Sequence, residues 1–104
     1  MPIYTIAEYR VRPSGVHKVK RAIQEFLPYI HIRKHEPGTR VYNAWQQKDD
    51  PTHFIHFFIF EHQAAVEAHS KSDAVKRFED AYGPELVGGG VVFTDYVNVA
   101  SKPE

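Results

Sequence analysis

Apolar and polar positions change period several times along the chain, and each change marks the boundary of an expected element. Residues Ile3 to Arg12 are rich in β-branched and aromatic types and predict a first strand. Val41 to Gln47, His53 to Glu61 and Val91 to Val99 have the same character and predict three more. The charged, Pro-containing stretch Lys48 to Pro51 predicts a hairpin turn between the second and third strands.

Helical spacing separates these strands. From Val16 onward the apolar residues recur at three- and four-residue intervals, which predicts an amphipathic helix with Ser14 as its N-cap. Pro28 lies within this pattern and lacks a backbone N–H, so we expect a kink or a break there. Gln63 to Ser70 and Asp73 to Tyr82 predict two short helical pieces.

The resulting order, β-α-β-β-α-β, is that of the ferredoxin-like α+β fold. Right-handed crossovers place the helices on one face of a four-stranded antiparallel sheet. We expect a single domain over residues 1–104, because a chain of this length holds one core. The Gly88-Gly89-Gly90 segment precedes a strand rather than a helix, so it predicts a flexible turn or a pocket lip and not a phosphate loop.

The third strand is apolar on both of its faces. One face carries Phe54, His56, Phe58 and Phe60, and the other carries Ile55, Phe57 and Ile59. The helices can cover only one face, and a bare second face would exceed the apolar patch that a soluble monomer tolerates. We therefore expect a homodimer through the open face of the sheet, with Trp45 toward that side or the strand edge.

Composition narrows the possible partners. The formal net charge is zero, so the sequence predicts no binding to nucleic acid or to an anionic membrane. There is no cysteine, which excludes disulfides, thiolate nucleophiles and zinc–thiolate sites. No apolar run approaches the roughly 18 residues of a membrane span, and Met1 to Thr5 does not start a signal peptide, so we expect a cytoplasmic protein.

Several short segments follow one another along nearly the whole chain. They are Glu8-Tyr9-Arg10-Val11, Pro13-Ser14-Gly15, Glu36-Pro37-Gly38, Tyr42, Asp49-Asp50-Pro51-Thr52, Phe60-Glu61 and Ala65 to His69. In order and spacing the chain resembles the antibiotic biosynthesis monooxygenase-like family, a branch of the dimeric α+β barrels. The resemblance implies that fold, a homodimer, and oxidation of a small phenolic or quinol-like aromatic by O₂ without a cofactor.

The chain also departs from relatives of this type. Family members often carry Glu where this chain has Phe58, and Trp where it has Phe60. The haem-degrading branch uses an Asn, a Trp and an iron-ligating His, and ungapped matching places Tyr9, His69 and Glu79 at those positions. All three differ, so we expect no haem.

Oxidation without a cofactor requires an apolar cavity, a base for the substrate hydroxyl and donors for the developing oxyanion. We expect the cavity between the sheet and the helices. His69 is the first candidate base because histidine titrates near neutral pH; alternatively it is partly exposed and bonds a backbone carbonyl. His56 is the second candidate, although a satisfied core or interface histidine would also suit its position among phenylalanines.

Five aromatic residues complete the predicted site. Tyr9 and Tyr42 would orient the substrate through their hydroxyls, unless both are ordinary amphipathic sheet residues. Phe58, Phe60 and Phe78 would form the walls, unless they only fill a core.

The seven histidines raise the question of a metal site. His31 and His35 are four residues apart and could share a helical face, whereas His53 and His56 point to opposite faces of a strand. No carboxylate is spaced to complete a triad, so we expect no metal. Two other functions stay open: a non-catalytic small-ligand-binding or stress-associated protein, and an isomerase or lyase on the same fold.

Overall fold

Four strands form one antiparallel sheet in the computed structural model, which describes residues 2–31 and 36–103. The strands are β1 (Ile3–Val11), β2 (Thr39–Gln47), β3 (Asp50–Phe60) and β4 (Leu86–Tyr96). Their spatial order is β2-β3-β1-β4, and every neighbouring pair is antiparallel. This order is the one expected for the predicted split βαβ arrangement.

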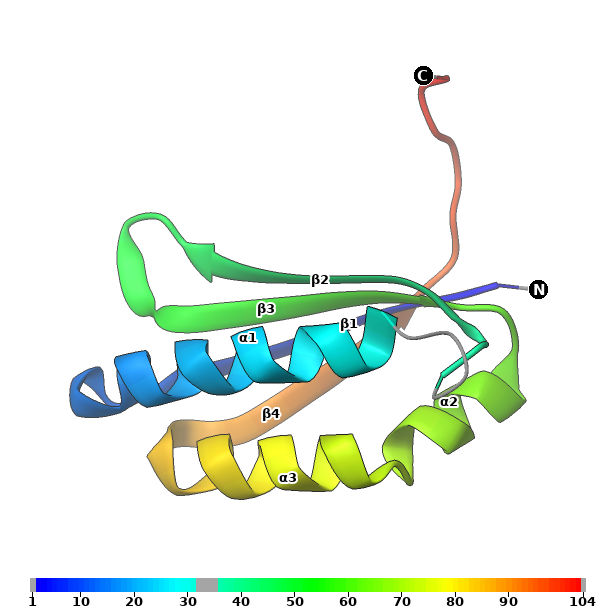
Figure 1. Cartoon of the computed structure of the whole chain (residues 1–104). Helices are drawn as coiled ribbons and strands as arrows, with labels where there is room; N and C mark the ends of the chain where they lie inside the picture. Colours follow the sequence, from blue (N-terminus) through cyan, green and yellow to red (C-terminus); the bar gives the residue numbers. More distant parts are fainter. Residues whose placement is uncertain (1, 32–35, 104) are drawn as a thin grey trace.

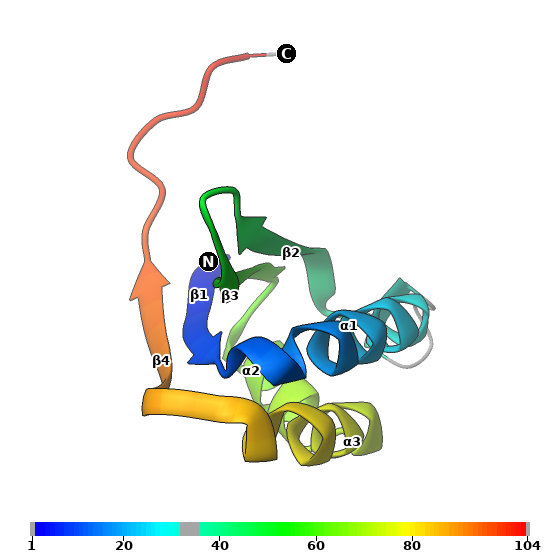
Figure 2. The same cartoon turned by 90° about the vertical axis from the view of Figure 1, so that its left-hand side faces the viewer.

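The helices lie on one face of this sheet. They are α1 (Val16–His31), α2 (Gln63–Ser70) and α3 (Asp73–Tyr82), with short 3₁₀ turns η1 (Pro13–Gly15) and η2 (Gly83–Glu85) beside them. Figure 1 and Figure 2 show α1 and α3 running side by side across the same face of the sheet, and Figure 1 shows α2 near one end. The predicted ferredoxin-like α+β fold is therefore confirmed. None of the described helices has the length and apolar character to cross a membrane.

The main core lies between α1, α3 and the sheet. Its buried members are Tyr9, Val11, Val19, Phe26, Phe54, Ala74, Phe78 and Tyr82. Phe26 of α1 stacks on Phe78 of α3 with ring centroids 5.3 Å apart. Burial of a large apolar side chain contributes about 1.5–3 kcal/mol, so this contact does much to fix both helices on the sheet.

The ends of the helices agree with the prediction for α3 and correct it for α1. Ser72 caps α3 by accepting a hydrogen bond from the Val75 N–H. Ser14 lies inside η1 instead of capping α1. Of the kink or break predicted at Pro28, the break is wrong, since α1 runs through Pro28 to His31. Pro28 cannot donate the intrahelical hydrogen bond to the Gln24 carbonyl, yet the helix continues for three residues beyond it.

Strand β4 corrects the prediction for the glycine segment. Gly88-Gly89-Gly90 is part of the strand, not a turn before it, because Leu86 and Val87 already pair with β1. The β1–β4 register shifts between Glu8 and Arg10, and Gly88 and Gly90 have φ of 74° and 80° there. Glycine adopts this left-handed backbone without the steric cost of a Cβ, so the segment is a bulge.

The other strand boundaries differ for simple reasons of pairing. Gln47 pairs with Asp50, so only Lys48 and Asp49 make the hairpin turn, which is shorter than predicted. The predicted last strand ran to Val99, but β4 ends at Tyr96. Tyr96 pairs with Tyr4 near the start of β1, so no strand lies opposite the residues that follow it.

The second face of the sheet is left open by the described residues. In β3, Phe54, His56, Phe58 and Phe60 are buried toward the helices, and Ile55, Phe57 and Ile59 are half-buried on the open side, as the alternation predicted. Trp45 is 52% exposed on this open face and stacks on Phe57 at 5.9 Å. Val92 and Tyr96 are also half exposed, so the open face is a broad apolar surface.

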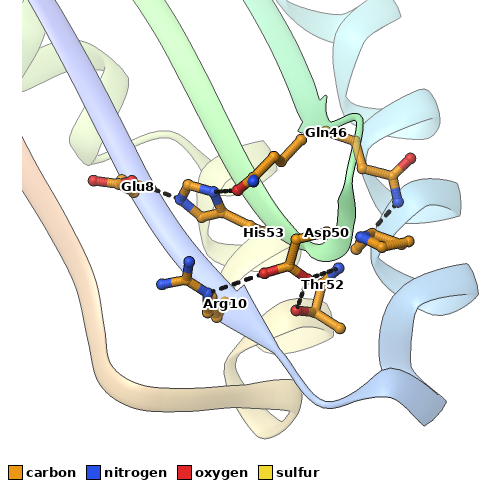
Figure 3. A network of polar contacts seen from close by, with 8 residues as sticks. Glu8, Arg10, Gln46, Asp50, Thr52 and His53 are labelled. Atoms are coloured by element: carbon orange, nitrogen blue, oxygen red, sulfur yellow. Dashed lines mark hydrogen bonds and ion pairs between the residues drawn. The ribbon is translucent and has the colours of Figure 1, made fainter.

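A polar cluster interrupts this apolar surface near the β2–β3 hairpin (Figure 3). The imidazole of His53 lies 2.6 Å from a Glu8 carboxylate oxygen and 2.6 Å from Gln47 Oε1. Arg10 pairs with Asp50 at 3.4 Å. We call Glu8, Gln47 and His53 the open-face polar cluster. His53 thus lies on the open face and His56 is buried toward the helices, which confirms that the two histidines point to opposite faces of β3.

Candidate functional site

A cavity of about 410 Å³ lies between the sheet and the helices, where the sequence predicted it. Its volume is within the range of small-molecule sites. The walls are mostly aromatic and include Tyr9, Phe26, Phe58, Phe60, Phe78 and Tyr82. Only a few polar side chains enter, which is the usual composition of a site that orients one apolar ligand.

Six of the seven predicted site residues line this cavity. They are His69, His56, Tyr9, Phe58, Phe60 and Phe78. Tyr42 is the exception: its ring stacks on Phe58 at 4.7 Å, and its side chain lines a neighbouring hollow between α1 and β2. Tyr42 therefore reaches the cavity only through the residues that it contacts.

The imidazole of His69 is paired with a buried carboxylate. Helix α2 begins at an N-cap formed by His62 and presents His69 in its last turn. Nδ1 of His69 lies 2.5 Å from Oε1 of Glu36. The ring packs against Phe58 and Phe60, with centroids 4.8 and 5.4 Å away. Apolar walls and a carboxylate together fix the orientation of the imidazole.

This pairing decides which nitrogen of His69 is available. An ionised carboxylate only accepts hydrogen bonds, so Nδ1 of His69 carries a proton in this pair, and in the neutral ring Nε2 then has a free lone pair. Nε2 has no hydrogen-bond partner among the described residues. A histidine held by a carboxylate on one nitrogen and open on the other is the arrangement of a general base.

Glu36 was not predicted as a site residue. It is only 3% exposed, and Thr39 Oγ1 donates a second hydrogen bond, of 3.2 Å, to Oε1. Its other oxygen, Oε2, is buried without a partner among the described residues. Such a group costs about 1–3 kcal/mol or more, so Glu36 is not placed here to gain stability. The Glu36-Pro37-Gly38 motif was its one signal in the sequence, and the spacing gave no sign of His69.

His56 lies in a second hydrogen-bonded group. Its Nε2 is 2.7 Å from the Tyr9 hydroxyl, and its Nδ1 is 2.7 Å from the Tyr42 hydroxyl. The residue is 3% exposed. Burial, helped by the nearby His69, lowers the pKa of His56 to about 3, so the imidazole is neutral at physiological pH. With both nitrogens occupied, His56 is less suited than His69 to accept a substrate proton.

The tyrosines around His56 stay protonated. Burial raises the pKa of Tyr9 well above its usual range, and neighbouring Tyr42 adds to the effect. Burial, followed by the charge of Glu36, raises the pKa of Tyr42 in the same direction. Burial also raises the pKa of Tyr82 to about 12. All three hydroxyls therefore act as neutral donors and acceptors.

The three residues that match the functional positions of the haem-degrading branch lie together at this cavity. Tyr9, His69 and Glu79 all line the cavity. No group of three or more metal-ligating side chains is found in the part of the chain that the structure describes. His35 of the predicted His31–His35 pair lies outside the described residues, and the side chain of His31 is not described.

An antiparallel sheet covered on one face by helices defines a ferredoxin-like protein, and the aromatic cavity between the two layers is its candidate small-molecule site. The chain belongs to the antibiotic biosynthesis monooxygenase family, whose model matches residues 2–81. No curated protein matches the chain in sequence.

Solved structures share the fold at low sequence identity. A protein of Nitrosomonas europaea named for the same family superposes with a TM-score of 0.83 at 19% identity, covering 94% of this chain and 99% of the other. Rv0793 of Mycobacterium tuberculosis gives 0.82 at 18%, covering 99% and 100%. PA3566 of Pseudomonas aeruginosa gives 0.80 at 20%, covering 95% of each chain. At these identities the likenesses establish the fold alone.

Proposed function

We propose that this protein oxidises a small phenolic or quinol-like aromatic with O₂, without a cofactor, in the cavity between sheet and helices. The observation that carries the proposal is the buried Glu36–His69 pair at an aromatic cavity. The walls suit a flat aromatic ring, and the pair supplies the one base that an electron-rich phenol needs. Membership of the monooxygenase family supports the same reaction class.

In this mechanism Nε2 of His69 removes the proton of the substrate hydroxyl. Glu36 holds the Nδ1–H and stabilises the imidazolium that forms, as the carboxylate of a catalytic triad does. The resulting phenolate is electron-rich enough to reduce O₂ directly. The apolar walls exclude water from the reacting atoms and strengthen each polar contact within the cavity.

The reaction balances without an outside reductant. One oxygen atom of O₂ enters the ring at a C–H carbon ortho or para to the phenolate, and the other leaves as water, so a phenol becomes a quinone and a quinol becomes a hydroxyquinone. All four electrons that reduce O₂ come from the substrate. The phenolic proton taken by His69 and the hydrogen displaced from the ring leave with the water.

We also propose that the protein works as a homodimer through the open face of the sheet. Trp45, Val92 and Tyr96 are each at least half exposed on this face, and Phe57 lies between them half-buried. In Figure 1 the helices of the described residues all lie on the other side of the sheet. A second copy stacked here would cover the surface with an interface of the obligate type, on the order of 2,000 Å² or more.

The function is tested by dioxygen consumption with a panel of quinols and naphthols. His69→Ala should lower turnover by roughly 10²–10⁴, the usual contribution of a positioned base, and should leave the dimer intact. Glu36→Gln should lower turnover less, since the amide still reaches Nδ1 but gives no charge to the imidazolium. His17→Ala, on the exposed side of α1, is the control.

Two outcomes would overturn the proposal. Full activity in His69→Ala would remove the base from the mechanism. If the wild type consumes no dioxygen with any member of the panel but binds them, the binding-protein alternative is favoured. Proton exchange at a carbon next to a carbonyl, without oxygen uptake, would instead favour the isomerase alternative on the same pair of residues.

A further inference from the structure

We infer that Tyr42, His56 and Tyr9 form a hydrogen-bond relay that presents the Tyr9 hydroxyl proton to an acceptor oxygen of the cavity ligand. The relay would make the cavity selective for aromatics that carry a carbonyl or oxyanion oxygen. This inference deepens the proposed function, because it rests on the same cavity, but it concerns recognition and not turnover.

The number of protons on His56 limits how it can bond to its two tyrosine neighbours. A neutral imidazole has one N–H and one bare nitrogen. Tyr9 and Tyr42 each lie 2.7 Å from a different ring nitrogen, so one of them must donate and the other must accept. The tyrosine that accepts keeps its own O–H free for another partner. Only two arrangements satisfy these contacts, and they run in opposite directions.

The two arrangements free different hydroxyls. If Tyr42 donates to Nδ1, then Nε2–H donates to Tyr9, and the Tyr9 O–H is free beside the main cavity. If Tyr9 donates to Nε2, the free O–H belongs to Tyr42, which lines the separate hollow between α1 and β2. No other hydrogen-bond partner of either hydroxyl is found among the described residues. An acceptor in the cavity would therefore select the first arrangement.

The relay would also strengthen the bond that it offers. A hydroxyl that accepts a hydrogen bond is a better donor, because successive bonds in a chain polarise one another. The relay lies in a buried, largely aromatic region, where each hydrogen bond is electrostatically stronger than in water. A donor placed in this way stabilises negative charge on a ligand oxygen as an oxyanion hole does.

Two polar contacts then come from opposite layers of the cavity. His69 on α2 would take a hydroxyl proton, and Tyr9 on β1 would donate to a second oxygen. A ligand that uses both has two oxygen functions on one flat ring system. Quinols, hydroxynaphthoquinones and related phenols with a second oxygen have this chemistry, and hydrocarbons of the same shape do not.

The direct test compares the binding of 1,4-naphthoquinone with that of naphthalene, which has the same bicyclic shape without the oxygens. The wild type should prefer the quinone, and Tyr9→Phe should lose roughly five- to tenfold of this preference, the value of one net hydrogen bond. Tyr42→Phe should lose a smaller part, although Tyr42 does not line the cavity. Tyr4→Phe removes a hydroxyl from the same strand on the open face of the sheet, away from the cavity, and should keep the preference.

The relay has its own spectroscopic readout. Long-range ¹H–¹⁵N correlation distinguishes protonated from bare imidazole nitrogens, and the His56 signals are identified by their loss in His56→Gln. In the naphthoquinone complex His56 should carry its proton on Nε2. A complex protonated on Nδ1, or a preference unaffected by Tyr9→Phe, would overturn the inference. A Tyr9→Phe effect with none from Tyr42→Phe would also refute the relay. These readouts need no turnover, so the absence of oxygen consumption would defeat the proposed function alone.

Discussion

The buried neutral imidazole of His56 should make the stability of the fold depend on pH in a defined window. In the folded chain its pKa is lowered to about 3, while an unfolded histidine titrates near 6.5. Between these values the unfolded chain binds one more proton than the folded chain at this position. The free energy of unfolding therefore falls as the pH is lowered through the window, and it is unaffected by His56 above about pH 7.

The size of the effect follows from the unfolded pKa. At about pH 5 the solution is roughly 1.5 units below 6.5, and each unit is worth about 1.4 kcal/mol, so His56 should cost about 2 kcal/mol relative to neutral pH. This figure does not depend on the folded value as long as that value lies well below 5. The loss should continue at about 1.4 kcal/mol per unit toward pH 3.

Urea unfolding at pH 8, 6.5 and 5, at one protein concentration, measures this slope. Other acidic and histidine groups also make the wild-type stability depend on pH, so the comparison is with His56→Gln. Between pH 8 and pH 5 the free energy of unfolding of His56→Gln should fall by about 2 kcal/mol less than that of the wild type. His17→Gln, at an exposed position, should retain the wild-type slope. Equal slopes for wild type and His56→Gln would show that His56 is not held neutral by burial.

Further predictions concern assembly, the β4 bulge and bound groups. Sedimentation at micromolar concentration should give twice the chain mass of 12.0 kDa. Phe57→Asp should abolish the dimer or the fold, whereas Lys71→Asp on the helical side should leave the dimer intact. A monomeric wild type or an unchanged Phe57→Asp dimer would contradict the interface. Gly90→Ala should lower the free energy of unfolding by about 1–2 kcal/mol, because the φ angle of Gly90 is +80°. Gly89→Ala should change it little, because Gly89 has an ordinary φ angle and open space at its Cβ position. Equal melting temperatures for the two variants would argue against the bulge. Purified protein should hold no stoichiometric metal, haem or flavin, and elemental analysis together with visible absorption tests this.

The fold was predictable because its signals are local and periodic. The alternation of Phe54 to Phe60 defined both faces of β3, and the spacing after Val16 defined the buried stripe of α1. The errors fall where pairing with a distant strand decides the outcome. Whether Gly88 to Gly90 forms a turn or a bulge depends on β1, and the end of β4 depends on where β1 begins.

The candidate site was predictable in its residue types but not in its connections. His69 was identified because histidine titrates near neutral pH, and the phenylalanines were identified as possible walls of a cavity between the sheet and the helices. The partner of His69 is 33 positions away in the chain, and no periodicity links the two. The same is true of Tyr9 and His56, which are 47 positions apart and meet only because β1 and β3 are neighbours. Hydrogen-bond partners across strands depend on register, which the sequence does not display.

The open-face polar cluster constrains how two copies of the chain can meet. A purely apolar surface tolerates many sliding offsets, because aliphatic and aromatic side chains contact one another at similar cost in each. Glu8 and His53 already satisfy each other, but an offset that buries the half-exposed Glu8 carboxylate under apolar side chains must still remove its water. In any homodimer built on this face, such offsets are penalised and those that leave the cluster at the rim are not. The cluster would thus set the alignment of the two sheets, while the surrounding apolar surface supplies the affinity.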